Sequence, residues 1–97
     1  MSDTMNGFSI TYEVVTQESA EYGDFKECGF LYEDLSLSDA VYKAINLGIY
    51  DNTGSDWFQS VDPDINYETG EETSYSLHYP RSTSNGTINR IKTLLNN

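Results

Sequence analysis

The sequence has little of several features that would assign it to a familiar class of protein. Its one cysteine, Cys28, leaves no second thiol for an intrachain disulfide, which excludes the disulfide-rich secreted scaffolds. The first twenty residues contain no basic segment and no apolar run, and no stretch approaches the ~20 apolar residues that span a bilayer. We therefore expect no secretion signal, no membrane association and a cytoplasmic location.

Groups that carry chemistry are also scarce. The chain has one histidine, His78, beside its single cysteine, and neither glycine-rich phosphate-binding pattern, GxGxxG or GxxxxGK[S/T], occurs. The segment from Asp62 to Asn66 begins like an EF-hand loop, but Tyr67 and Thr73 stand where that loop requires glycine and glutamate. Acidic pairs are many, yet nothing selects one of them for acid–base work. We expect no catalytic residue, no metal and no cofactor.

Positive charge is scarce compared with negative charge. Five Lys and Arg face sixteen Asp and Glu, for a net charge of −11. All sixteen acids lie within residues 1–72, whereas residues 73–97 carry three bases and no acid. Such a chain repels the phosphates of nucleic acid and attracts basic surfaces, which are most often the nucleic-acid sites of other proteins. We expect no direct binding of nucleic acid and one strongly negative face. The alternative is that the charge serves only solubility.

What is present is typical of one small α+β domain spanning residues 1–97. Apolar and polar residues alternate from Phe8 to Val14, which predicts a strand. Residues 16–34 show no clean period and are read as an acidic loop, with a possible short strand over residues 30–32. Residues 35–48 predict a helix that is capped by Ser36 and stopped by Gly48.

The second half predicts more strands and a second helix. A short strand is expected near residues 57–61, a β-hairpin that turns at Gly70 over residues 64–79, a polar linker over 82–87 and a helix over 88–95. We therefore predict an antiparallel sheet of three to five strands with helices on one face, in the order β-α-β-β-β-α. The predicted core comprises Ile10, Tyr12, Leu37, Val41, Ile45, Leu77, Ile91 and Leu94.

The acidic stretches are the candidate partner-binding surface. Seven acids over 22 extended residues give one charge per ~10 Å, far from the one per ~1.7 Å of duplex DNA. Mimicry of DNA would therefore require tertiary convergence of the acids. Interleaved aromatic residues would anchor the contact. The predicted surface consists of Glu18, Glu21, Tyr22, Asp24, Phe25, Asp51, Asp56, Trp57, Asp62, Asp64, Tyr67, Glu68, Glu71 and Glu72.

Four segments carry a family resemblance: ITYEVVTQESAEYGDFKECGF, LSLSDAVYKA, YETGEETSYSLHYP and INRIKTLL. Together they resemble small proteins from phages and mobile elements, and the chain is similar in size and acidity to anti-CRISPR and anti-restriction proteins. The resemblance brings no functional residues with it. It implies a non-catalytic inhibitor that occupies the basic nucleic-acid site of a bacterial defence complex, such as a CRISPR–Cas effector, as a monomer or weak dimer. The alternative is a phage or plasmid accessory module that binds another protein.

Overall fold

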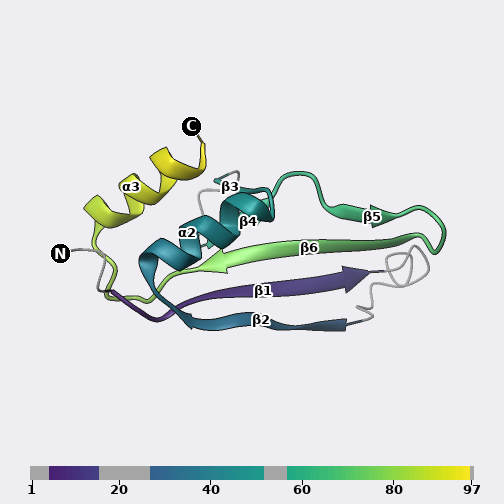
Figure 1. Cartoon of the computed structure of the whole chain (residues 1–97), viewed down its shortest axis with the longest axis horizontal. Coiled ribbons are helices and arrows are strands. Elements are labelled where there is room, and N and C mark those ends of the chain that lie inside the picture. Colours follow the sequence, from purple (N-terminus) through teal and green to yellow (C-terminus); the bar gives the residue numbers. More distant parts are fainter. Residues whose placement is uncertain (1–4, 16–26, 52–56, 97) are drawn as a thin grey trace.

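The computed structural model describes residues 5–15, 27–51 and 57–96. Its strands form one antiparallel sheet in the order β2-β1-β6-β4-β3, with β5 paired to β6 (Figure 1). The elements in chain order are β1 (Phe8–Val15), β2 (Glu27–Leu35), α2 (Leu37–Asn46), β3 (Ile49–Tyr50), β4 (Trp57–Ser60), β5 (Asp64–Asn66), β6 (Glu71–His78) and α3 (Asn85–Leu95). The predicted α+β class is confirmed. The described sheet has six strands, however, rather than three to five.

The structure differs most from the prediction at β2 and β3, which lie where the sequence lacks a regular period. β2 covers nine residues, far more than the expected 30–32. The sequence does not reveal this length, because the pairing of β2 with β1 shifts register twice. Each shift places an extra residue in β2 and interrupts the alternation of apolar and polar side chains. One of these irregular positions contains Asp34, whose φ is +52°. β3 has only two residues, too few to form a recognisable pattern.

Helix α2 forms where its capping residues predict. The hydroxyl of Ser36 accepts a hydrogen bond of 3.2 Å from the backbone N–H of Asp39, and Gly48 follows the helix at φ +71°. The sequence also placed Ile45 in the core, and this prediction is wrong because Ile45 is exposed. At 100° per residue it lies about 80° around the helix from Leu37, at the border of the buried stripe.

Helix α3 begins earlier than predicted. The hydroxyl of Ser84 accepts a hydrogen bond from the N–H of Thr87, so residues 85–87 form the first turn rather than the end of a linker. Ile91 and Leu95, four residues apart, are buried against the rest of the core. Leu94 was predicted to share that core but is exposed. At 100° per residue it lies about 60° around the helix from Ile91 and about 100° from Leu95, at the border of the buried stripe.

The core lies between the two helices and one face of the sheet (Figure 1). Ile10, Leu77 and Phe58 are register partners on neighbouring strands, so their side chains share that face. Tyr12, also predicted for the core, is only half-buried. The buried residues are Phe8, Ile10, Leu37, Ala40, Val41, Ala44, Ile49, Phe58, Leu77, Ile91 and Leu95.

The strands continue well past the helices. The molecule measures 46 × 24 × 20 Å, and its radius of gyration of 14.2 Å exceeds the about 12.5 Å of a compact chain of this length. We call the projecting part the arm; among the described residues it consists of 12–15, 27–29 and 61–74 (Figure 1). The remaining described residues, which contain the whole core, form the body. The arm therefore presents side chains to solvent without contributing to the core.

Candidate partner-binding surface

Charge is divided between the two parts of the molecule. Among the described residues the four bases, Lys43, Arg81, Arg90 and Lys92, all belong to the body. The described residues of the arm contain no base and seven acids: Glu13, Glu27, Asp62, Asp64, Glu68, Glu71 and Glu72. The asymmetry seen along the sequence thus becomes a separation in space, with the negative charge at the projecting end.

The β5–β6 hairpin concentrates this charge. Asp64 pairs with Thr73, and Asn66 pairs with Glu71, so the chain folds back on itself. From Asp64 to Glu68 in the turn the hairpin extends over four residue steps, or about 13 Å at ~3.3 Å per step. Four acids lie within this length: Asp64, Glu68, Glu71 and Glu72. That is one charge per ~3 Å, close to the ~3.4 Å spacing along a single DNA strand and about half the density of the duplex. Extended, the same stretch from Asp64 to Glu72 would be about 26 Å long, so folding back on itself doubles its charge density.

The turn between these strands is held by several hydrogen bonds. The N–H of Gly70 donates to the carbonyl oxygen of Asn66 at 2.8 Å, and Gly70 has φ +74°. The side-chain Oδ1 of Asn66 accepts from the N–H of Glu68 at 3.0 Å, and Thr69 Oγ1 accepts from the N–H of Glu71 at 3.3 Å. These bonds hold the backbone of the turn, which presents Tyr67 with 89% of its surface exposed.

The acids of the arm lie on both faces of the sheet. Asp64 and Glu71 occupy one face, since register partners share a face and neighbours along a strand alternate. Glu72 lies on the opposite face, as does Glu13, whose register partner is Ser74. On the arm a hollow of about 580 Å³ is lined by Asp64, Ile65, Asn66, Tyr67, Glu68, Glu71 and Thr73. The arm is therefore negative around its circumference rather than along one flat plate.

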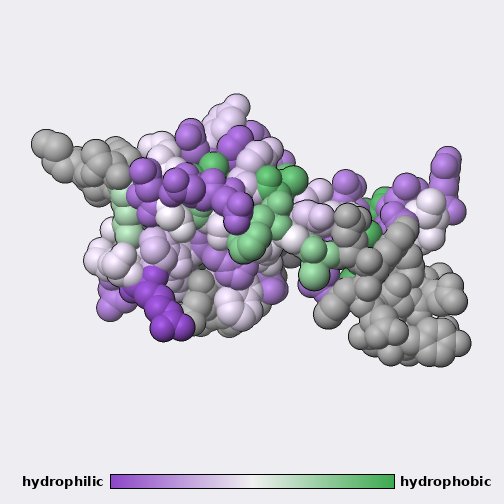
Figure 2. Space-filling model, turned by 90° about the horizontal axis from the view of Figure 1, so that it is seen from below, coloured by the Kyte–Doolittle hydropathy of each residue, from purple (hydrophilic) through white to green (hydrophobic). Residues whose placement is uncertain are grey.

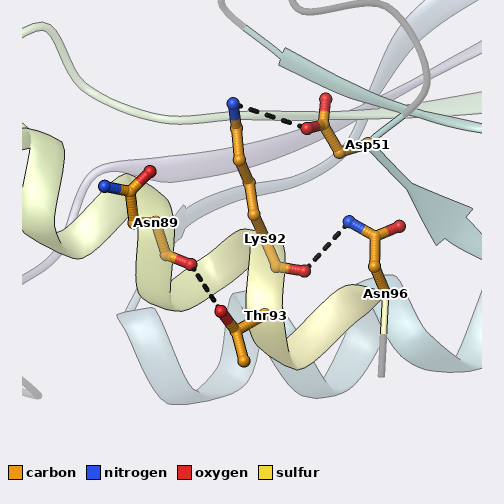
Figure 3. A network of polar contacts seen from close by, with 5 residues as sticks. All are labelled: Asp51, Asn89, Lys92, Thr93 and Asn96. Carbon is orange, nitrogen blue, oxygen red and sulfur yellow. Dashed lines mark hydrogen bonds and ion pairs between the residues drawn. The ribbon is translucent and has the colours of Figure 1, made fainter.

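Two of the predicted surface residues lie on the body. The carboxylate of Asp51, which follows β3, lies 3.4 Å from the Nζ of Lys92 on α3 (Figure 3). This ion pair partly compensates the charge of Asp51 within the chain. Trp57 lies in β4, and its ring centroid is 5.6 Å from that of His78. Neither residue joins the acids of the arm.

The other predicted residues divide into two groups. Asp62, Asp64, Tyr67, Glu68, Glu71 and Glu72 come together on the arm. Glu18, Glu21, Tyr22, Asp24, Phe25 and Asp56 lie outside the described residues. Two acids of the arm, Glu13 and Glu27, were absent from the predicted surface. Glu13 lies across from Ser74, near Glu72 on the same face. For Glu13 the available signal was its outward position in the alternating strand β1.

The single cysteine and the single histidine are well separated. In the sheet Cys28 lies opposite Glu13 of β1, and His78 lies opposite Ser9 of β1. Glu13 and Ser9 are about 13 Å apart along that strand. That distance is too long for proton transfer from the thiol to the imidazole. His78 instead lies 3.3 Å from Thr11 Oγ1, and partial burial lowers its pKa below the ordinary value for histidine.

Further chemical arrangements are missing from the part of the chain that the structure describes. No three His, Cys, Asp or Glu side chains in these ranges lie close enough together to hold a metal ion. No helix among them is long and apolar enough to cross a membrane. No family model, no curated protein and no solved structure matches the chain. Function is therefore inferred from the arrangement of the residues themselves.

Proposed function

We propose that this protein is a non-catalytic binding protein whose acidic arm docks on a positively charged surface of a partner protein. The observation that carries the proposal is the arm itself, where the described residues comprise seven acids and no base. Most of these carboxylates stand on paired strands and a hydrogen-bonded turn, so little backbone order is lost on binding. The exposed ring of Tyr67 supplies an aromatic anchor beside the charges.

The partner we propose is a bacterial defence complex that binds nucleic acid through a basic surface, such as a CRISPR–Cas effector. The spacing of about one carboxylate per ~3 Å on the β5–β6 hairpin supports this choice, because it approaches the phosphate spacing of one DNA strand. A ligand with that spacing competes for the lysines and arginines that contact phosphate. In this proposal the protein inhibits by occupying the nucleic-acid site.

Charge reversal on the hairpin tests the proposal. After capture of the partner from a bacterial host lysate and its identification by mass spectrometry, binding is measured by calorimetry with the purified partner. The Asp62→Lys, Asp64→Lys, Glu68→Lys variant is expected to lose binding while remaining folded, because all three side chains are exposed. Binding of the unchanged protein should weaken as salt rises, because exposed charges are screened beyond ~8–10 Å.

A matched pair of variants separates position from net charge. Asp62→Asn, Asp64→Asn, Glu68→Gln on the arm raises the net charge by three, as does Ser38→Lys, Asn46→Lys, Asn89→Lys on exposed helix positions. At ~0.5–1 kcal/mol for each lost contact, the arm variant should bind about 10–100-fold more weakly and the helix variant much less so. Equal effects would indicate a general role of charge. Full affinity in the folded reversal variant would leave solubility as the role of the acids.

A further inference from the structure

Strand β2 lies at one edge of the sheet that the described residues form. In the described part of the chain β2 pairs only with β1, and it runs for nine residues. The other strands with an open side, β3 and β5, have two and three residues. Proteins keep free edges short because their unpaired N–H and C=O groups accept further strands. Only β2 is long enough here to bind another strand.

Apolar side chains accompany this edge. Phe30, Leu31 and Tyr32 are consecutive residues of β2, and all three are exposed, Phe30 by 60%. Figure 2 views the molecule from below, the side along which β2 runs in Figure 1, and shows hydrophobic surface near the middle of that side. A strand laid along β2 would shield part of this surface from water, which adds a hydrophobic contribution to its backbone hydrogen bonds.

The same edge is unsuited to a second copy of this chain. Glu33 and Asp34 are exposed near its end, and Asp34 adopts a positive φ at an irregular position of the strand. These charges oppose pairing with a second copy, which carries the same carboxylates and a net charge of −11. A segment that carries lysine or arginine turns the same carboxylates into an attraction.

We infer that the edge of β2 binds an extended, lysine- or arginine-bearing segment of a partner protein, which adds a strand to the sheet. Its backbone pairs with β2, an apolar side chain covers Phe30, and its basic side chains reach Glu33 and Asp34. The ring of Tyr32 already has the Nζ of Lys43 at 4.1 Å from its centroid, which steadies this part of the edge. The contact is separate from the acidic hairpin and does not depend on the function proposed above.

The test uses a synthetic nine-residue peptide of alternating lysine and valine and the ¹⁵N-labelled full chain. NMR titration gives the affinity, and amide hydrogen exchange shows where a strand has been added. We expect shifts and at least ~10-fold slower exchange along β2, since new backbone hydrogen bonds protect its amides. A control peptide with a methyl group on every backbone nitrogen keeps the charge but has no N–H donors to pair with β2, so it should not protect the β2 amides.

Variants test each part of the recognition. Phe30→Ala should lower the affinity for the peptide about tenfold. Tyr42→Ala, which removes a 68% exposed aromatic ring on α2, should leave that affinity unchanged. The double variant Glu33→Gln, Asp34→Asn should also weaken peptide binding. The arm variant Asp62→Asn, Asp64→Asn, Glu68→Gln should not. The inference is overturned if the shifts map to the β5–β6 hairpin, or if the N-methylated peptide binds equally well. It is also overturned if sedimentation shows a dimer whose β2 amides are protected without peptide.

Discussion

Leu77→Ala gives the sharpest test of the fold. Leu77 lies in the middle of β6, is 1% exposed, and pairs with Ile10 on β1 and Phe58 on β4, both buried. Truncation to alanine removes three carbon atoms, which is worth about 2.4 kcal/mol of transfer free energy at ~0.8 kcal/mol each. The cavity left beneath the helices adds to this, so we expect the free energy of unfolding to fall by about 3 kcal/mol.

Urea unfolding followed by circular dichroism and by the fluorescence of Trp57 measures this loss. A domain of this size loses about 4–8 °C in Tm per kcal/mol, so the melting temperature should fall by about 12–24 °C. Leu94→Ala is the matched control, since it is the same chemical change at a residue that is 43% exposed, and should cost under ~1 kcal/mol. A cost below ~0.5 kcal/mol for Leu77→Ala, or one equal to that of Leu94→Ala, would refute the strand phase that places Leu77 in the core.

Three further changes probe local features. Ser36→Ala removes the hydroxyl that accepts from the N–H of Asp39 and should cost about 1 kcal/mol in urea unfolding; no change would mean the cap contributes nothing. Gly48→Ala should cost about 1 kcal/mol although no atom lies within 4 Å of the added carbon, because φ is +71°, whereas Gly86→Ala in the first turn of α3 should be neutral or stabilising. His78 has a lowered pKa in the folded state, so the unfolded state binds more protons below pH 6.5. The free energy of unfolding should therefore be highest above pH 6.5 and should fall as the pH is lowered below it. The His78→Gln variant should show a smaller fall between pH 7 and 5.

Local signals in the sequence determined several elements by themselves. The alternation after Phe8 predicts β1, Ser36 and Gly48 predict the ends of α2, and Gly70 predicts the hairpin turn, and the structure confirms each. These signals are reliable because a strand's period, a helix cap and a positive φ each depend on residues that are adjacent in the chain. The excess of acids over bases was likewise evident, together with its confinement to residues 1–72.

Pairing between distant segments decided the rest. β2 could not be read at its full length, because its period is broken by register shifts that exist only against β1. Ile45 and Leu94 left the predicted core because the packing of α2 and α3 selects which side of each helix is covered. The same holds for charge. Asp51 became the partner of Lys92, while the acids of the β5–β6 hairpin came together because antiparallel pairing folds two stretches of chain into one length.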